Sequence, residues 1–173
     1  MPKAIDFSRL SIQDAFDLAI LIEEEAKERY EEFVDQLDLH HTPEAADFFR
    51  QMVGNEAKHG DALAARRKQR FGDVPMNVTR EMLWDVEAPE YHQVSAFMTV
   101  RQALEVALEA ETKAHDFFAK AVGHLSDPEV KGLFLELQDE EIKHQGMVRQ
   151  ILAKLPADSA LAPDVNADPP VAH

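Results

Sequence analysis

Apolar side chains recur every three or four residues along four long stretches of the chain, separated by polar and proline-containing segments. This spacing is typical of amphipathic helices that bury one face in a shared core. Residues 1–10 precede the first stretch as a short arm. Helix-start signals stand before the four stretches: Ser11 with Asp14, Thr42 with Pro43, Thr99 with Gln102, and Ser126-Asp127-Pro128. The pattern predicts an all-α protein with helices at about 11–39, 42–70, 99–124 and 127–154.

The segment between the second and third helices breaks the helical pattern with Gly72, Pro75 and Pro89. An extended connection covers about 3.3 Å per residue, so residues 71–98 can run back along a helix roughly 40 Å long. We expect a long crossover with one short helix from Thr79 to Val86. Its aromatic residues should cover the bundle surface or a subunit contact: Trp84, Tyr91 and Phe97. A linker between two domains is the alternative, although neither flank has enough helices to close a core alone.

The chain length favours a single domain, which we place at 1–155. The tail at 156–173 contains four prolines and few large apolar side chains, so we expect it to be extended or disordered. The basic run at 66–70 falls in the last turns of the second helix, where positive charge offsets the helix dipole. We interpret that run as a solvated helix end.

The two halves of the chain repeat one helical hairpin. A shift of 88 positions places Glu23 on Glu111 and Tyr30 on Phe118. A shift of 85 positions places Glu56-x-x-His59 on Glu141-x-x-His144, so the second hairpin has a shorter loop. Two related hairpins predict a four-helix bundle with pseudo-twofold symmetry.

Six ionisable residues fall on the apolar stripes of these helices. Burial of such groups is costly unless they are paired or bind metal, and an i, i+3 spacing puts each Glu-x-x-His pair on one helix face. A dinuclear metal site is therefore the leading hypothesis, with these ligands: Glu23, Glu56, His59, Glu111, Glu141 and His144. The alternative is a buried acid–histidine network without metal, but four acids and two imidazoles would leave a charge imbalance.

Tyr30 lies two turns after Glu23 on the same helix face. We expect it to pack in the core with its hydroxyl bonded to a carboxylate of the site, and a redox role is the alternative. Six other histidines lack such context, and we interpret them as surface or connector residues: His40, His41, His92, His115, His124 and His173.

The composition excludes some kinds of site and argues against some kinds of partner. The chain has no cysteine, which excludes disulfides, thiolate metal sites and a cysteine-rich iron centre. A formal net charge of −15 argues against nucleic acid and anionic membranes as partners. No transmembrane run and no N-terminal signal segment is visible, so we expect a cytoplasmic protein.

The residues of the proposed site resemble those of the rubrerythrin-like branch of the ferritin-like superfamily. Glu23-x-x-Ala26-x-x-x-Tyr30 is similar to the family's first-helix signature, and both Glu-x-x-His pairs match its ligand pairs. The resemblance implies a di-iron carboxylate centre in which Glu23 and Glu111 are terminal ligands. It also implies two bridging carboxylates and one imidazole for each metal: Glu56, Glu141, His59 and His144.

This resemblance implies two iron ions, replaceable by zinc or manganese, and an oxidoreductase that reduces hydrogen peroxide or dioxygen. Without cysteines the chain carries no rubredoxin domain, so electrons should come from a separate donor protein. Ala114 occupies a position where rubrerythrins carry an additional glutamate that switches as a ligand. Ferritin-like iron oxidation and storage, or a non-catalytic bundle that binds zinc or no metal, are the alternatives. We expect a homodimer, with the contact at 71–98.

Overall fold

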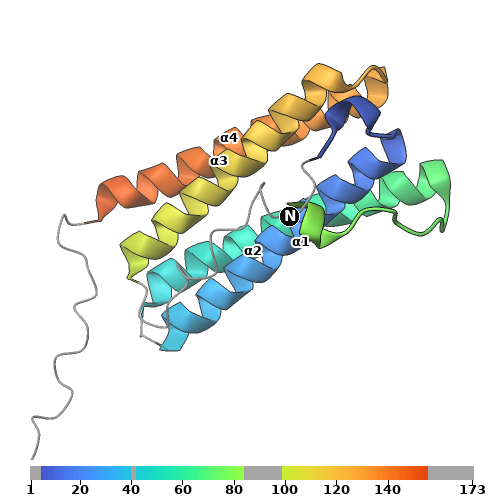
Figure 1. Cartoon of the computed structure of the whole chain (residues 1–173). Helices are drawn as coiled ribbons and strands as arrows, with labels where there is room; N and C mark the ends of the chain where they lie inside the picture. Colours follow the sequence, from blue (N-terminus) through green and yellow to red (C-terminus); the bar gives the residue numbers. More distant parts are fainter. Residues whose placement is uncertain (1–4, 40–41, 84–98, 156–173) are drawn as a thin grey trace, which may run out of the picture.

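The computed structural model describes residues 5–39, 42–83 and 99–155. It contains four long helices and two short 3-10 helices: α1 Ile12–Leu39, α2 Pro43–Phe71, α3 Val100–His124, α4 Pro128–Lys154, η1 Phe7–Arg9 and η2 Arg80–Leu83. Helix α1 packs against α2, and α3 packs against α4, as two antiparallel hairpins that lie side by side (Figure 1). This confirms the predicted all-α four-helix bundle, and each long helix begins and ends within one residue of its predicted position.

The helix ends follow the predicted chemistry with one exception. The Ser11 hydroxyl accepts a hydrogen bond from the Asp14 amide at 3.0 Å, and Thr99 forms a reciprocal capping box with Gln102. Thr42, in contrast, does not cap α2 with its side chain, because its hydroxyl donates to the Leu37 carbonyl at 2.8 Å. Pro43 follows it and has no N–H that would need a cap. Thr42 thus marks the start of α2, as predicted, but supplies no side-chain cap.

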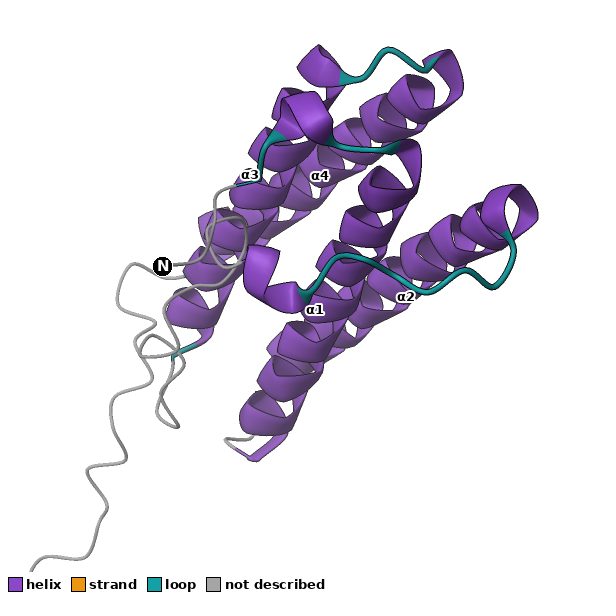
Figure 2. Ribbon diagram, turned by 45° about the vertical axis from the view of Figure 1, so that its right-hand side comes forward, coloured by secondary structure: helices purple, strands orange, loops and turns teal. Residues whose placement is uncertain are grey.

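The described start of the crossover, residues 72–83, returns along α1 (Figure 2). The Gln13 side chain donates to the Pro75 carbonyl at 3.2 Å, and Arg80 donates to both oxygens of Glu28 at 2.7 and 2.8 Å. A short helix is predicted from Thr79 to Val86. Within the described residues, this stretch forms the 3-10 helix η2, Arg80–Leu83. Several predictions concern positions outside the described residues. These positions are the rest of that helix at 84–86, the aromatic residues Trp84, Tyr91 and Phe97, the tail at 156–173, and the histidines His40, His41, His92 and His173.

One member of the basic run at the end of α2 differs from its predicted environment. Arg67 is buried, forms an ion pair with the fully buried Asp17 and donates to the Val74 carbonyl at 2.6 Å. The guanidinium points inward because a desolvated aspartate needs a charged partner. The description of this run as a solvated helix end is therefore wrong for Arg67. It holds for its neighbours Arg66 and Lys68, which are largely exposed.

The core consists of two apolar clusters, one toward each end of the bundle. One cluster includes Phe16, Phe118 and Phe134, and the other is built around Tyr30 and Phe49. The buried glutamates of all four helices belong to neither cluster, although they are as deeply buried as the apolar residues. The bundle thus encloses a layer of acidic side chains between two apolar clusters.

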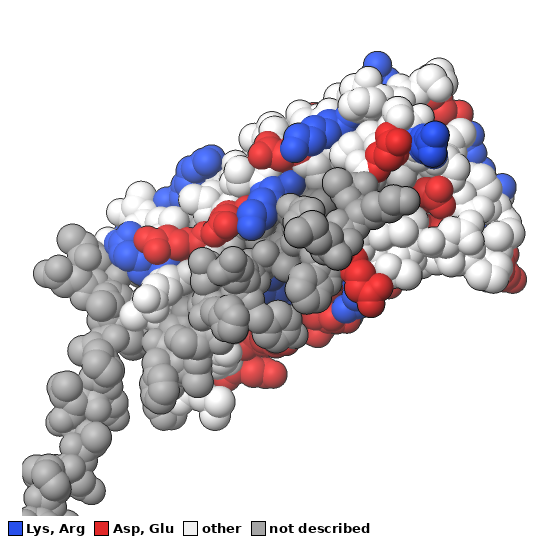
Figure 3. All heavy atoms as spheres, viewed as in Figure 1, with Lys and Arg blue, Asp and Glu red and all other residues white. Residues whose placement is uncertain are grey.

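The surface carries charges of both signs. On the face seen in Figure 3, basic and acidic side chains of the described residues alternate along the helices, without an extended basic patch there. Among the described residues, no helix is both long enough and apolar enough to cross a membrane.

Candidate metal centre

Each of the four long helices contributes one of the predicted glutamates to the interior of the bundle. Their exposed fractions are between 1 and 3%: Glu23 on α1, Glu56 on α2, Glu111 on α3 and Glu141 on α4. The helical i, i+3 spacing places His59 one turn after Glu56 and His144 one turn after Glu141. The two imidazole rings stack across the bundle with their centroids 5.6 Å apart.

The half of the site around His144 is tightly connected. Its Nδ1 atom lies 3.1 Å from Glu56 Oε1 and 3.2 Å from Glu111 Oε2, and the side chain is only 3% exposed. Burial alone would lower the pKa of His144, but hydrogen bonds to Glu111 and Glu56 raise it to about 10. These two neighbours therefore favour the positively charged form of the imidazole.

The half around His59 is more open. Its Nδ1 atom faces Glu23 Oε2 at 3.6 Å and Glu56 Oε2 at 4.0 Å, and 22% of the side chain is exposed. Both distances exceed hydrogen-bond length. This buried ring nitrogen has no hydrogen-bond partner among the described residues.

The two halves share the Glu56 carboxylate. One group of donor atoms within 4.8 Å of one another comes from Glu23, Glu56 and His59, and a second comes from Glu56, Glu111 and His144. Each group could hold a metal ion. Because Glu56 presents one oxygen to each histidine, it occupies the position expected of a bridging ligand.

Glu141 lies in neither of these two groups, but it hydrogen-bonds to Glu111. Burial, followed by the Glu111 charge, raises the pKa of Glu141 well above its ordinary value. Burial and the neighbouring Glu23 raise the pKa of Glu56 in the same way. Burial also acts to raise the pKa of Glu111, but hydrogen bonds from Glu141, His144 and Tyr30 outweigh it and hold the pKa below its usual range. Burial thus favours the uncharged forms of Glu56 and Glu141, while hydrogen bonds favour the charged form of Glu111.

Tyr30 is fully buried and donates its hydroxyl hydrogen to Glu111 Oε1. Burial, and then the Glu111 charge, raises the pKa of Tyr30 well above its ordinary value, so the phenol keeps its proton. This confirms that the hydroxyl bonds to a carboxylate of the site. Phe118, at the matching position of the second hairpin, is equally buried and has no such donor.

The donor set fits a pair of divalent cations. Carboxylate oxygens and imidazole nitrogens are the ligands that iron, manganese and zinc share. The unpartnered Nδ1 of His59 points toward two carboxylates, as a ligand atom would. Four buried glutamates would also be neutralised by two divalent charges.

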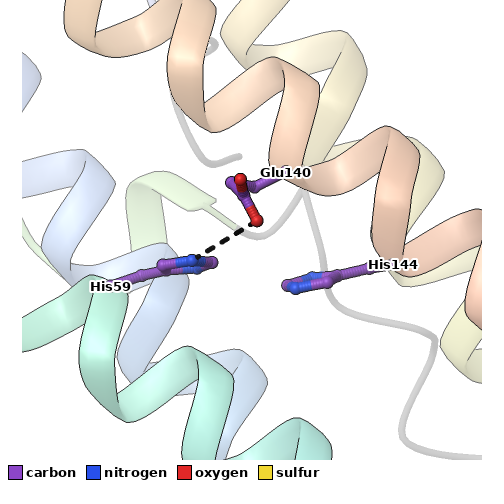
Figure 4. Close-up of side chains that lie close together, drawn as sticks. All are labelled: His59, Glu140 and His144. Carbon is purple, nitrogen blue, oxygen red and sulfur yellow. Dashed lines mark ion pairs between the residues drawn. The ribbon is translucent and has the colours of Figure 1, made fainter.

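The structure adds one residue that the sequence did not single out. Glu140 on α4 reaches the outer side of the two imidazoles, and its Oε2 lies 3.8 Å from His59 Nε2 (Figure 4). Donor atoms of Glu140, His59 and His144 also lie within 4.8 Å of one another. The only sequence signal is that Glu140 directly precedes Glu141, a feature that many exposed helix residues share. His115 and His124, in contrast, bond only to nearby surface groups in the described part of the chain.

Known proteins resemble this chain in sequence and structure. A solved crystal structure of an uncharacterized conserved protein from Magnetospirillum magnetotacticum is 27% identical in sequence, with a TM-score of 0.72. The similarity covers 84% of this chain and 96% of that one. No curated protein matches this chain. The rubrerythrin family model matches residues 14–161, which is most of the chain, and the protein therefore belongs to the rubrerythrin family.

Proposed function

We propose that this protein is a non-haem di-iron oxidoreductase that reduces hydrogen peroxide or dioxygen with electrons from a separate donor protein. One observation carries the proposal: Glu56 faces both histidines, so the two possible ligand groups meet at one shared carboxylate. A shared ligand favours two ions held side by side over two separate mononuclear sites.

The residues that would hold the metals divide between the two halves of the site. Glu23 and His59 would hold one ion, Glu111 and His144 the other, and Glu56 would bridge them, with Glu141 as the second proposed bridge. Two adjacent ferrous ions can supply both electrons needed to cleave an O–O bond. Reduction of one peroxide to two waters consumes two electrons and two protons, and the donor protein restores the electrons.

The protein itself supplies positioning, proton placement and exclusion of water. Tyr30 holds Glu111 by a hydrogen bond, while burial raises the pKa values of Glu56 and Glu141 and so favours their protonated forms. Aromatic and aliphatic clusters separate the carboxylates from solvent at both ends of the bundle. The partial exposure of His59 marks the side on which a small oxidant can approach.

Anaerobic loading with ferrous iron followed by peroxide tests this function. We expect about two irons per chain, conversion to the oxidised absorption spectrum, and catalytic loss of peroxide when a chemical reductant is supplied. Glu141→Ala should lose both iron binding and turnover, whereas Glu136→Ala, on an exposed position of the same helix, should lose neither. Iron-loaded wild-type protein that neither peroxide nor dioxygen oxidises would refute the oxidoreductase and leave the metal site intact.

Iron oxidation and storage is the second candidate, and Ala114 is the observation that favours it. This residue is a buried alanine, so the position supplies no carboxylate for the ligand switch that the resemblance implies. If the protein stores iron, the number of bound oxidised iron ions should rise well above two per chain, and these ions should stay bound. Peroxide turnover at constant iron content favours the oxidoreductase instead.

A further inference from the structure

The two ring nitrogens of His59 face different parts of the protein. Nδ1 points into the bundle, 3.6 Å from Glu23 and 4.0 Å from Glu56. Nε2 points outward, 3.8 Å from Glu140 Oε2, as the dashed line in Figure 4 marks. A neutral imidazole carries its hydrogen on only one of these nitrogens, and the neighbour of the other nitrogen decides which one can bind metal.

We propose that Glu140 is a positioning residue of the metal centre, which accepts the Nε2 hydrogen of His59 and leaves Nδ1 as the metal ligand. Histidines that bind metal commonly donate their other N–H to a carboxylate, which fixes the tautomer and orientation of the ring. This inference rests on the proposed metal centre. It assigns a role to a residue outside the six predicted ligands.

The two oxygens of Glu140 divide between two partners. Lys143, one turn further along α4, donates to Oε1, while Oε2 faces His59. Lys143 thus holds the carboxylate beside the ring. The Glu140 side chain is 33% exposed, so it has room to move the roughly 1 Å that separates 3.8 Å from hydrogen-bond length.

His59 needs such support more than His144 does. His144 is fixed by two buried carboxylates, whereas the described structure gives His59 Nδ1 no hydrogen bond. The stacked neighbouring ring limits tilting of His59 but not the choice of tautomer. Glu140 comes from the opposite hairpin, so its contact with His59 also joins α2 to α4 across the site.

A simpler role for Glu140 is an ordinary surface ion pair with Lys143. Such i, i+3 pairs form on many exposed helices and contribute little. The two roles differ in what removal of the carboxylate changes. Loss of a surface pair leaves metal binding unaffected, whereas loss of the positioning contact weakens the ion that His59 binds.

The test compares Glu140→Ala with the matched control Glu136→Ala. Glu136 lies one turn earlier on the same helix and pairs with Arg66, so its removal changes the same charge near the site. Titration with Zn²⁺ against a competing chelator should show about 10- to 100-fold weaker binding of one of the two ions in Glu140→Ala. Glu136→Ala should match the wild type, and Glu140→Gln, which keeps an acceptor oxygen, should recover most of the affinity.

Nitrogen-15 NMR of the zinc-loaded protein gives a second readout, the position and exchange rate of the His59 ring hydrogen. This readout would not change if Glu140 only stabilised the helix. In the wild type, His59 should carry its hydrogen on Nε2, and that hydrogen should exchange slowly with water. In Glu140→Ala the exchange should become fast, while the unfolding midpoint of the metal-free protein stays unchanged.

Failure of this inference is distinguishable from failure of the proposed function. Wild-type protein that binds two zinc ions, with equal affinities for Glu140→Ala and Glu136→Ala, overturns the inference alone. A His59 that binds zinc through Nε2 also overturns it. Wild-type protein that binds no metal overturns the metal centre and the inference together.

Discussion

The two histidines occupy matching positions of a repeated hairpin but have different surroundings. His144 is buried against Glu56 and Glu111 at hydrogen-bond distance, whereas His59 is partly exposed and more than 3.5 Å from its nearest acidic neighbours. The repeat therefore preserves the types of ligand without preserving their environment. One half of the site is a closely connected cluster, and the other half is more open, with Glu140 on its outer side.

Glu56→Gln should have the largest effect on metal binding, because Glu56 belongs to both halves of the site. Burial and Glu23 raise the pKa of Glu56, which favours the uncharged acid that glutamine resembles. We expect the unfolding free energy of the metal-free protein to change by no more than about 1 kcal/mol. Metal content should fall from about two ions per chain to none, because the shared ligand is lost. Elemental analysis and urea unfolding measure the two quantities, and two retained ions would exclude Glu56 as the bridge.

Alanine at each histidine in turn separates the two halves. His144→Ala leaves the buried Glu111 carboxylate without its cation, and should destabilise the metal-free protein by about 3–5 kcal/mol. His59→Ala removes a partly exposed ring, and should cost less than about 1 kcal/mol. Both variants should lose metal. Equal losses of stability in urea unfolding would show that the two halves are equivalent before metal binds.

The stability of the metal-free protein should fall as the pH rises from about 6.5 to 10. The pKa of His144 is raised to about 10, so its stabilising charge is complete below its unfolded value and is lost as pH approaches 10. The raised pKa values of Glu56 and Glu141 act in the same direction, since the folded state keeps protons that the unfolded state has released. We expect a decrease of a few kcal/mol, measured by urea unfolding across this range. His144→Ala should flatten the profile, and His59→Ala should not.

Tyr30→Phe should have the smallest effect on metal binding, because it makes the first hairpin match the second. The ring keeps its contacts with Phe33 and Phe49, while Glu111 loses one buried donor. We expect a loss of about 1–3 kcal/mol in the metal-free protein, with both metal ions retained. Loss of metal from this variant would place Tyr30 among the residues that hold the site together.

Local and repeated features made most of the fold predictable. Helical periodicity and the start signals place the four long helices to within one residue. The 88- and 85-residue shifts pair Glu23 with Glu111, and the structure brings both into one interior. Ionisable residues on an apolar stripe are visible in a sequence because burial is rare for such groups.

Tertiary contacts account for what the sequence missed. Glu140 sits one position away from the buried stripe of α4, and only the approach of α2 brings His59 to it. Arg67 is one of several basic residues at the end of α2, and its burial depends on Asp17 facing it from α1. Neither pairing leaves a periodic signal, because each joins residues from different helices.

The two apolar clusters that enclose the acidic layer have a consequence for the order of assembly. Neither cluster contains a proposed metal ligand, and the raised pKa values of Glu56 and Glu141 favour uncharged carboxyl groups between the clusters. Small metal domains such as zinc fingers fold only once the ion is bound. We therefore expect this bundle to fold before metal binds. Under the proposed function, the supply of iron would then govern when the protein becomes active and not whether it folds.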